Sequence, residues 1–581
     1  MLSVPSCIDR RTEKTLEKIW NIAKHDHSRA AQLASEIGVA PLVAALLIAR
    51  GYGTAETALK FLNPCYEHLH DPYLLKGMDT AVKRIFAAIE AGEKILIWGD
   101  YDVDGTTGTV LLRKALKILG ASTSFHVPNR FTEGYGINIP ALEEAKADGC
   151  KVVISVDCGI RSFEPVAWAK EHGLDFIVTD HHLSDPERGN PDAFAVINPN
   201  QPDCTYPDKH LAGVGVAFKL AHALLRERQK ENLVPAFLKI AAIGTVADIM
   251  KLTGENRAIV SLGLRDLTNT RNYGLKALME VSDCRSDMTS YHIGFRIAPR
   301  INAAGRMDVA RHVIELFEAE DFSEARKLAA LLDSRNRERQ SVQQQITELA
   351  LTETRDLSET KFVVVAGEGW HRGVIGLAAS RIAERLHRPS IVLSIEDGYA
   401  HGSARSVADY HLLNALESCS DLFEQFGGHA AAAGMKLKSE NIDALRAALG
   451  AFAETSLTGN LLYPTLRIDA RLSPKTLSLK LVKDINALEP FGAGNPKPIF
   501  VTNGLYVRDE PYVMKDKHLK FWLDDRAGNR FEAVWWDGVQ RSEGRTLTAG
   551  SRIEVAYTAE ANTWQANTRL QLVVEDVRSD N

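Results

Sequence analysis

Three aspartates alternate with other residues in the segment GDYDVDGTTGT (99–109): Asp100, Asp102 and Asp104. Alternate side chains of an extended backbone lie on one side, so this spacing predicts three carboxylates on one face. Carboxylates this close repel one another unless cations neutralise them. Gly105 permits a sharp turn, and Thr106 or Thr107 can cap a following helix. On its own, such a segment is most often an ordinary acidic turn.

Further acidic groups follow two other apolar runs. KVVISVDCG (151–159) contains Asp157, and DFIVTDHH (175–182) ends in Asp180, His181 and His182. GTVADIM (244–250) adds Asp248. Carboxylates with one or two imidazoles suit Mn²⁺ or Mg²⁺ better than a metal that prefers thiolates. The nearby Cys158 is a small hydrophobic residue to which we assign no role.

The elements that must position these residues follow from the same pattern. From about residue 80, short β-branched runs alternate with helical stretches, which predicts βαβ units and a parallel sheet. The acids at 100, 157 and 180 then lie at the carboxyl ends of parallel strands, where open α/β sheets build active sites. Because neighbours in an extended segment point opposite ways, we expect His181 and His182 not to bind one metal ion together.

The rest of the chain shows other patterns. Residues 1–75 are predicted to be helical, with helices joined by a glycine turn over 42–64. Residues 310–357 are polar, largely free of Gly and Pro and apolar at helical spacing, which predicts one long connecting helix. A second α/β unit begins at 361–367, and short alternating strands over about 462–581 predict a small antiparallel barrel.

The composition is typical of a folded, multidomain protein, with 581 residues, 45% hydrophobic and 25% charged. A net charge of −6 gives no general attraction to nucleic acid, so an enzyme acting on it must gather positive charge locally. Seven cysteines without a CxxC pair disfavour disulfides and a structural zinc site. Without a leader pattern or a run of roughly 20 apolar residues, we expect a cytoplasmic protein with no membrane segment.

Together these motifs resemble the DHH phosphoesterase superfamily, whose third motif stands here at 180–182 and whose fourth contains Asp248. HRGVIG (371–376), GSARS (402–406) and GGHAAAAG (427–434) resemble the associated DHHA1 substrate-binding domain. The order of the motifs, the length and the C-terminal barrel are similar to the RecJ family of single-strand exonucleases. This similarity covers essentially the whole chain after the N-terminal region.

The resemblance implies two divalent cations, Mn²⁺ or Mg²⁺, about 3.5–4 Å apart. Asp157 would bridge them. The remaining implied ligands are, for one site, Asp104, His181 and Asp248, and for the other, Asp102 and Asp100. Some relatives carry a histidine at the position of Trp98, so we expect this second site to have fewer ligands and to be the weaker one.

The DHH tripeptide also supplies groups for the substrate. By resemblance, His182 contacts the scissile phosphate, as a donor or as the acid for the leaving group. Asp180 lies behind the ligands and orients the histidines.

Two small-residue stretches of the second α/β unit carry further candidates. Their exposed backbone amides could approach phosphate, with Arg405 supplying charge. Tight packing between a helix and a sheet explains the same stretches, although it explains His429 least well. By resemblance, three residues face nucleic acid across a cleft from the metals: Ser403, Arg405 and His429.

Two loops between the motifs offer candidates for strand binding. PNRFTEGYGIN (128–138) combines Arg130 with Tyr135, and in the RecJ family such a loop helps to bind the 5′ phosphate. A plain surface loop is the alternative. RIAPRINAAGRM (296–307) could line the same cleft or be an ordinary solvated charge run, and its candidates are Arg300, Asn302 and Arg306.

In the C-terminal region, alternation in LKFWLDD (519–525) places Lys520 and Trp522 outward, opposite three inward apolar side chains. An aromatic residue beside a lysine on a barrel face is how OB-folds stack single-stranded bases. Three other tryptophans stay open between core and surface: Trp535, Trp536 and Trp564.

We therefore predict an α/β, multidomain protein with five regions: a helical part (1–75), a DHH metal-binding domain (76–309), a connecting helix (310–357), a DHHA1-like domain (358–456) and an OB-fold (462–577). The resemblance implies a single-stranded-DNA-specific 5′→3′ exonuclease that releases mononucleotides in DNA recombination and mismatch repair. It also implies that the partners are single-stranded DNA, a single-strand-binding protein and a RecQ-type helicase. We expect the enzyme to be a monomer.

Three other functions stay open. An oligonucleotide or nucleotide phosphatase of the same superfamily would resemble the two α/β domains without the long helix and barrel. A non-catalytic, single-strand-binding replication scaffold would have lost metal ligands, and none of the main acids is missing. An aminoacyl-tRNA editing protein would share only the region around GGH.

Overall fold

The computed structural model describes residues 17–129, 132–134, 136–307, 310–354, 360–407, 409–542, 545, 547–565 and 567–580. The chain forms two compact units, which we describe separately. The acidic-motif unit comprises Lys60–Ile346 and Glu489–Pro496. The barrel unit comprises Met1–Leu59, Thr347–Leu488 and Lys497–Asn581.

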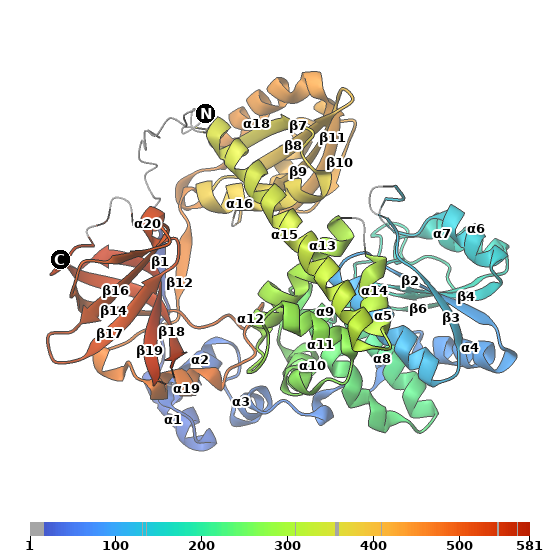
Figure 1. Ribbon diagram of the computed structural model, residues 1–581, viewed down its shortest axis with the longest axis horizontal. Coiled ribbons are helices and arrows are strands. Elements are labelled where there is room, and N and C mark those ends of the chain that lie inside the picture. Colours follow the sequence, from blue (N-terminus) through green and yellow to red (C-terminus); the bar gives the residue numbers. More distant parts are fainter. Residues whose placement is uncertain are drawn as a thin grey trace. The chain divides into compact units, whose positions relative to one another are not determined.

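A five-stranded sheet of order β3-β2-β4-β5-β6 lies at the centre of the acidic-motif unit (Figure 1). Every neighbouring pair is parallel, as the βαβ pattern predicts. The strands are β2 (Lys94–Gly99), β3 (Ser122–His126), β4 (Cys150–Val156), β5 (Asp175–Thr179) and β6 (Ala195–Ile197). β2 pairs with β4 up to Gly99 opposite Val156, so the residues after these strands meet at one edge.

Helices cover both faces of this sheet. One face packs on α4 (Met78–Ala91), α5 (Val103–Ile118) and α8 (Gly213–Glu227). The other packs on α6 (Ile139–Ala147) and α7 (Phe163–Glu171). α5 leads from β2 to β3, while α7 leads from β4 to β5 on the opposite face. The chain therefore changes direction between β2 and β4, the kind of switch point where open α/β sheets bind ligands.

A group of helices completes this unit: α9 (Leu238–Ala247), α10 (Gly254–Arg265), α11 (Tyr273–Val281), α12 (Ser290–His292), the π-helix η5 (Ile293–Ile297), α13 (Ala298–Arg306) and α14 (Arg311–Glu318). α15 (Phe322–Glu353) follows. The prediction of one helix over 310–357 is wrong, because α14 ends at Glu318. Ala319 has a non-helical ψ of 129°, and the Asp321 carboxylate caps α15 by accepting from the Ser323 and Glu324 amides.

The barrel unit contains a mixed five-stranded sheet of order β10-β11-β9-β8-β7. Its strands are β7 (Val363–Glu368), β8 (Ser390–Glu396), β9 (Tyr399–Arg405), β10 (Gln425–Gly428) and β11 (Ala432–Lys438). α16 (Arg372–Leu386) packs along β8 and β9, and α18 (Ile442–Ser456) along β7, with α17 (Leu412–Glu417) beside α18 (Figure 1). The apolar run at 361–367 thus forms β7, which pairs in parallel with its neighbour β8.

The second sheet of this unit closes into a barrel of order β13-β14-β18-β19-β17-β16-β15, because β14 also pairs with β16. Its strands are β13 (Ala470–Arg471), β14 (Phe500–Val507), β15 (Tyr512–Met514), β16 (His518–Asp524), β17 (Arg530–Trp535), β18 (Arg552–Trp564) and β19 (Asn567–Ser579). α19 (Leu479–Asn486) and α20 (Gly538–Arg541) accompany them. The purely antiparallel prediction is wrong, since β17–β19 and β13–β14 are parallel.

The N-terminal residues belong partly to this barrel unit. α1 (His27–Ile37), α2 (Pro41–Ala49) and α3 (Ala55–Leu62) agree with the helical prediction. β1 (Ile19–Ile22) does not, because it pairs in parallel with β12 (Thr465–Ile468), and the Trp20 indole donates to Asp576 at 2.8 Å. Only this partner strand, more than 400 residues away, makes the segment a strand. Among the described residues no single helix is long and apolar enough to cross a membrane; α1 and α2 meet the criterion only together, with a 110° bend between them.

Candidate active site

The acidic segment after β2 is a strand-to-helix turn, so its predicted extended conformation is wrong. β2 ends at Gly99, and Asp102 is the N-cap of α5, accepting from the Gly105 amide at 3.0 Å. Thr106 does not cap the helix but donates to the Asp102 carbonyl. A Cβ at Gly105 would lie 2.6 Å from the Asp100 nitrogen, so glycine is needed there for close packing rather than for a turn.

Asp104 lies in the first turn of α5 and is almost fully buried. Its carboxylate accepts from the Gly213 and Val214 amides at 2.6 and 2.8 Å, and these two residues begin α8. A helix N-terminus favours an anion, which helps to hold this carboxylate in place. Burial, with the nearby charges of Asp248 and Asp102, nevertheless raises the pKa of Asp104 well above its usual range.

Asp157 follows β4 at the switch point, with a φ of 63° that aspartate adopts more readily than most residues. Its Oδ1 is buried and has no hydrogen-bond partner among the described residues. Burial and then the charges of Asp104 and Asp102 raise the pKa of Asp157 well above its usual range. A buried carboxylate oxygen that accepts no hydrogen bond and is surrounded by other acids fits a bound cation.

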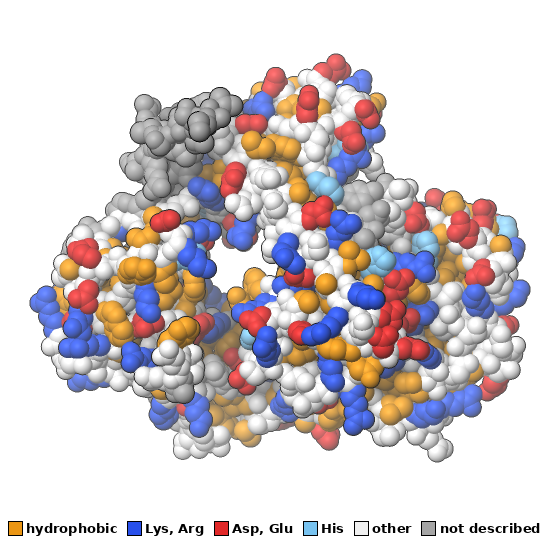
Figure 2. All heavy atoms as spheres, viewed as in Figure 1, with side chains coloured by type: hydrophobic (Ala, Val, Ile, Leu, Met, Phe, Trp, Pro, Cys, Tyr) orange, Lys and Arg blue, Asp and Glu red, His pale blue; other side chains and the backbone are white. Residues whose placement is uncertain are grey.

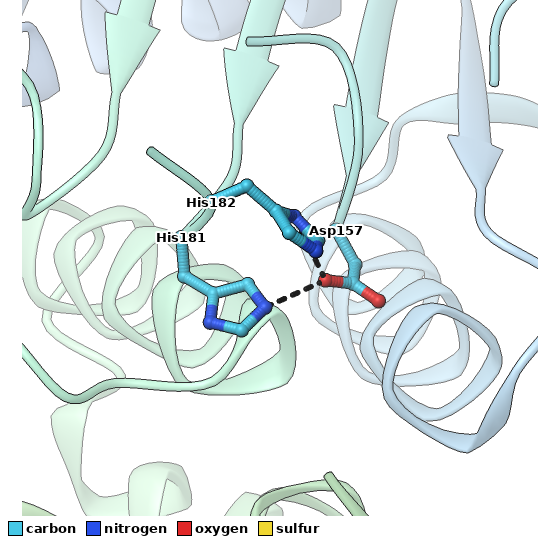
Figure 3. Close-up of side chains that lie close together, drawn as sticks. All are labelled: Asp157, His181 and His182. Carbon is cyan, nitrogen blue, oxygen red and sulfur yellow. Dashed lines mark ion pairs between the residues drawn. The ribbon is translucent and has the colours of Figure 1, made fainter. Parts of the chain in front are cut away.

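Both histidines of the DHH tripeptide turn toward Asp157, as Figure 3 shows. The His181 Nε2 lies 3.1 Å and the His182 Nδ1 3.9 Å from the Asp157 Oδ1, and the ring centroids are 4.5 Å apart. The prediction that the two histidines point opposite ways is therefore wrong. β5 ends at Thr179, and strand alternation does not extend into the loop that follows.

The two histidines differ in exposure and in partners. The His181 side chain is 11% exposed, and its Nε2 lies 3.6 Å from Asp248 and 3.9 Å from Asp104. Burial and the neighbouring His182 lower the pKa of His181 to about 4. The His182 side chain is 48% exposed. His181 is thus a neutral, buried imidazole that faces three acids and could offer a lone pair to a metal ion, while His182 is open to solvent.

Asp180 stabilises this loop through hydrogen bonds. One oxygen accepts from the His182 Nδ1 at 2.8 Å and from both histidine amides, and the other accepts from the Ile160 amide. Burial alone would raise the pKa of Asp180, but hydrogen bonding and the charge of His182 lower it below its usual value. The hydrogen bond to Asp180 in turn raises the pKa of His182.

These side chains form three groups whose ligand atoms lie within 4.8 Å of one another: Asp100, Asp102 and Asp157; Asp104, His181 and Asp248; and Asp157, His181 and His182. The pKa of Asp248 is raised to about 7 by burial and then by Asp102. Groups that combine carboxylates with imidazole, as the last two do, suit Mn²⁺ or Mg²⁺. Trp98 is buried in β2 and packs on His126, with ring centroids 4.3 Å apart.

α13 brings two predicted substrate residues toward the acidic turn. A Cβ at Gly305 would lie 2.3 Å from the Tyr101 carbonyl oxygen, so α13 packs directly on the loop between Asp100 and Asp102. Asn302 and Arg306 are half-buried on this helix. Arg300 instead donates to Asp333 at 2.9 Å, which attaches α13 to α15, and to the Arg296 and Val281 carbonyls. The structure gives Arg300 a structural role rather than that of a solvated charge.

In the barrel unit, the two small-residue stretches lie side by side. β9 pairs with β11, which puts Arg405 opposite Ala432, and the Arg405 guanidinium donates to the Ser403 hydroxyl at 2.9 Å. His429 is exposed in the turn between β10 and β11. Arg130 and Tyr135 lie outside the described residues.

A groove of about 280 Å³ opens on the barrel. It is lined by Leu477, Trp522, Asn529, Arg530, Phe531, Glu532, Arg569 and Leu570. Trp522 points outward, as alternation along β16 predicts, whereas Lys520 pairs with Glu532 at 3.2 Å. Trp535 fills the core, while Trp536 and Trp564 are 51% and 74% exposed. Figure 2 shows basic side chains interspersed with acidic ones over the face in view, in keeping with the small net charge.

Sequence reasoning missed four contributors to these sites. The amides of Gly213 and Val214 donate to Asp104. The sequence feature that could have indicated this role is the GVG triplet at the start of the apolar helix over 213–225. Arg530 and Arg569 are exposed beside Trp522, and β17 and β19 bring them there. No spacing along the chain relates these two arginines to Trp522.

Comparison with known proteins identifies the family. Three family models match: the DHH family, N-terminal domain, over residues 94–245, the DHHA1 domain over 359–455, and the RecJ OB domain over 468–576. The single-stranded-DNA-specific exonuclease RecJ of Bacillus subtilis strain 168 is 40% identical over 563 residues, which cover 96% of this chain and 70% of that protein. The chain belongs to the RecJ family.

Other RecJ proteins show the same relationship. Escherichia coli K12 RecJ is 32% identical over 591 residues, covering 96% of this chain and 98% of that protein. The crystal structure of RecJ from Thermus thermophilus in complex with Mn²⁺ superposes with a TM-score of 0.82 at 29% identity, over 97% of this chain and 80% of that one. The predicted family and the α/β architecture with DHH, DHHA1 and OB domains are therefore confirmed.

Proposed function

We propose that the chain is a metal-dependent exonuclease that hydrolyses the phosphodiester bonds of single-stranded DNA from the 5′ end and releases mononucleotides. The observation that carries this proposal is the position of Asp157. It belongs to one ligand group with Asp100 and Asp102. Its Oδ1 also lies 3.1 Å from the Nε2 of His181, which belongs to the ligand group of Asp104 and Asp248. A carboxylate shared in this way suits two divalent cations.

The donors and their surroundings fit Mn²⁺ or Mg²⁺. Asp100, Asp102 and Asp157 would hold one ion, and Asp104, His181 and Asp248 the other. When bound, such ions supply an activated water and stabilise the charge that develops on the phosphate oxygens. The protein fixes the ligands beforehand, since the N-terminus of α8 holds Asp104 through two amides. Burial and then mutual repulsion raise the pKa values of Asp104 and Asp157, and bound cations would offset both costs.

His182 is the residue of the tripeptide that can reach a substrate. Its side chain is 48% exposed. Its Nδ1 donates to Asp180, and this hydrogen bond fixes the orientation of the ring and leaves Nε2 as the nitrogen for the substrate. We assign His182 to the scissile phosphate, as donor or as the acid that protonates the leaving oxygen. Asp180 orients this ring and is not itself a ligand.

Further residues would hold the strand. In the barrel groove, Trp522 offers a stacking surface near Arg530 and Arg569, and an aromatic ring combined with positive charge is the pairing that binds unpaired bases. Other substrate contacts in our proposal are Ser403, Arg405, His429, Asn302, Arg306, Arg130 and Tyr135. Arg300 is not included, because Asp333 already engages it.

The names of the curated relatives support single-stranded DNA as the substrate. We extend the proposal to a monomer acting in the cytoplasm, in DNA recombination and mismatch repair, with a single-strand-binding protein and a RecQ-type helicase as partners. The five regions given in the sequence analysis stay part of this proposal, except that two helices, α14 and α15, take the place of the single connecting helix.

A nuclease assay with end-labelled strands tests the function. Single strands labelled at either end, with a 5′ phosphate or a 5′ hydroxyl, are incubated with Mn²⁺, Mg²⁺ or chelator. We expect immediate release of labelled mononucleotide only from 5′-labelled strands and only with metal. Arg405→Ala and Arg130→Ala should slow the phosphorylated strand selectively, because a guanidinium grips phosphate oxygens. Degradation that begins at the 3′ end, or that continues in chelator, would contradict the proposal.

A further inference from the structure

An unusual helical segment precedes the contact between α13 and the acidic turn. α12, η5 and α13 follow one another without a gap from Ser290 to Arg306, and the middle part is a π-helix. Pro299 has no N–H to donate to the carbonyl four residues back, and the helix widens just before it. Single π turns inside helices are frequent at functional sites.

Two stacked aromatic rings of this segment face solvent, one on α12 and one on η5. Tyr291 and Phe295 are 57% and 71% exposed. Their ring centroids lie 4.9 Å apart and the planes meet at 28°. Single exposed apolar side chains are ordinary, but two large rings held nearly parallel and open form a flat surface ready for a third ring.

The element that carries Phe295 packs against the helix that ends beside a proposed metal ligand. η5 packs against α9, and a Cβ at Gly294 would lie 3.8 Å from the Val246 side chain. Asp248 is the C-cap of α9, two residues after Val246. Ile249 follows with a φ of 57°, strained for a β-branched residue, and is 75% exposed. An exposed apolar residue therefore lies directly beside Asp248, at the end of the helix against which η5 packs.

The segment Glu489–Pro496 connects α12, which carries Tyr291, to the residues that follow Asp248. The Ser290 hydroxyl donates to the Phe491 carbonyl at the start of α12. The Leu252 amide donates to the Ala493 carbonyl at 2.7 Å, four residues after Asp248. The rings are thus presented from a braced element rather than a free loop.

The charges around the pair suit a polyanion. Arg296 follows Phe295 on the same turn, and its guanidinium donates to the Asp283 carbonyl. Acids also lie in this region: the Asp283 carboxylate is 3.6 Å from the Arg285 guanidinium, and the charge of Asp287 acts on His292, the neighbour of Tyr291. Positive charge beside stacked aromatic rings favours unpaired nucleotides over an apolar peptide.

We propose that Tyr291 and Phe295 form a stacking platform for bases of the single strand close to the metal centre. This inference rests on the proposed function and adds the residues that hold the nucleotides flanking the bond to be cut. Every base has a π face, so such contacts accept any sequence. A base paired in a duplex cannot stack on these rings, so the platform also contributes to single-strand selectivity.

Steady-state cleavage of 5′-phosphorylated single strands by the full chain tests the platform. Tyr291→Ala with Phe295→Ala should raise KM about tenfold and leave kcat within about twofold, because the rings bind bases and do not touch the metals. Binding of labelled strand, measured on an Asp157→Ala background, should weaken by the same factor. Tyr291→Phe with Phe295→Tyr keeps both rings and should restore KM. Tyr273→Ala removes a 42% exposed tyrosine on α11 and is the matched control.

Strands carrying a short run of abasic sites at successive distances from the 5′ end give the decisive comparison. For the unchanged chain, one position of the run should raise KM about tenfold, and in the double alanine variant the same run should have no further effect. Additive effects, or an unchanged KM in the double variant, would overturn the inference. A loss of melting temperature together with kcat would also overturn it, since that outcome indicates a structural role. If the unchanged chain fails to degrade single strands from the 5′ end, the proposed function itself fails.

Discussion

At the scale of single residues, burial decides which acids can hold cations. Asp104 and Asp157 are 1% and 2% exposed and face each other's charge. Burying a carboxylate costs several kcal/mol, so two such groups that repel each other favour a positive partner or a proton. The imidazole of His181, kept neutral by burial, offers a lone pair and no competing charge. The chemistry of the site therefore follows from exclusion of water as much as from residue type.

We predict that Asp157→Ala abolishes cleavage while the chain still binds single strands. Loss of the shared carboxylate leaves two cations to repel one another, whereas the groove at Trp522 is untouched. Mn²⁺ at about 100 times its dissociation constant stabilises a folded chain by about 2.7 kcal/mol. The melting temperature of the unchanged chain should therefore rise with Mn²⁺, and that of the variant much less.

The control for this prediction is Asp192→Ala, which removes an aspartate that is 83% exposed and paired with Lys170 in a surface ion pair. It should keep both activity and the Mn²⁺-dependent rise. Near-normal turnover of Asp157→Ala in added Mn²⁺ would mean that the shared-ligand assignment has to be dropped.

The two adjacent histidines should separate into different kinetic effects. His181→Ala removes a buried donor that faces three acids, so activity should need more Mn²⁺. His182→Ala removes the exposed ring on Asp180, so kcat should fall by about 10²–10⁴-fold with little change in the Mn²⁺ requirement. Titrating activity against Mn²⁺ for both variants checks this. Equal shifts in the Mn²⁺ requirement would make His182 a ligand instead.

At the scale of elements, the site is built where strands end and a helix begins. β2 and β4 deliver Asp100 and Asp157 at the switch point, and α8 begins against both Asp104 and Asp157. A Cβ at Gly213 would lie 2.5 Å from the Asp157 Cβ. The Gly213 and Val214 amides can reach the Asp104 carboxylate only because residue 213 carries no side chain that would collide with Asp157.

We predict opposite outcomes for two neighbouring glycines of α8. Gly213→Ala should lower the melting temperature and activity, since the new methyl group displaces Asp157 or the start of the helix. Gly215→Ala adds a methyl group 3.4 Å from Leu211, an ordinary contact, and should keep activity and gain up to about 1 kcal/mol from helix propensity. Thermal melts and Mn²⁺-saturated turnover of both variants check this. Full activity in Gly213→Ala would show that the carboxylates tolerate displacement.

At the scale of the whole molecule, sequence order and structural units do not coincide. Glu489–Pro496 lies between barrel elements in sequence, yet it belongs to the acidic-motif unit. There the buried Arg257 donates to the Glu489 and Pro490 carbonyls. β1 in turn needs β12 as its partner strand. Removing residues 462–581 would therefore disturb both units, and point substitutions test the barrel more cleanly.

We predict that Trp522→Ala weakens binding of long single strands and spares cleavage of short oligomers. Each base stacked on an aromatic ring contributes about 1–3 kcal/mol, so the dissociation constant should rise about fivefold or more, increasingly with strand length. Trp536→Ala, which removes a half-exposed tryptophan outside the groove, is the control. Strand affinity and melting temperature are measured together. An unchanged affinity in a stably folded variant would remove Trp522 from the strand contacts.

Much of this protein could be predicted from the sequence because the deciding signals are local. The β-branched runs at 94–100, 151–159 and 175–182 form β2, β4 and β5, since period and length suffice to define buried strands. Acids placed directly after such strands must share an edge in a parallel sheet. Alternation also predicted the outward direction of Trp522, because one face of β16 is buried.

Tertiary structure alone decided the features that depend on distant partners or on where an element ends. His181 and His182 face one carboxylate because β5 stops at Thr179, and β1 is a strand because β12 lies beside it. The α8 amides reach Asp104 from more than 100 residues away, and Arg530 and Arg569 join Trp522 through neighbouring strands. A sequence pattern records local periodicity and residue type. Hydrogen bonds and packing between distant segments fix the direction of each side chain, and these are set only when the chain folds.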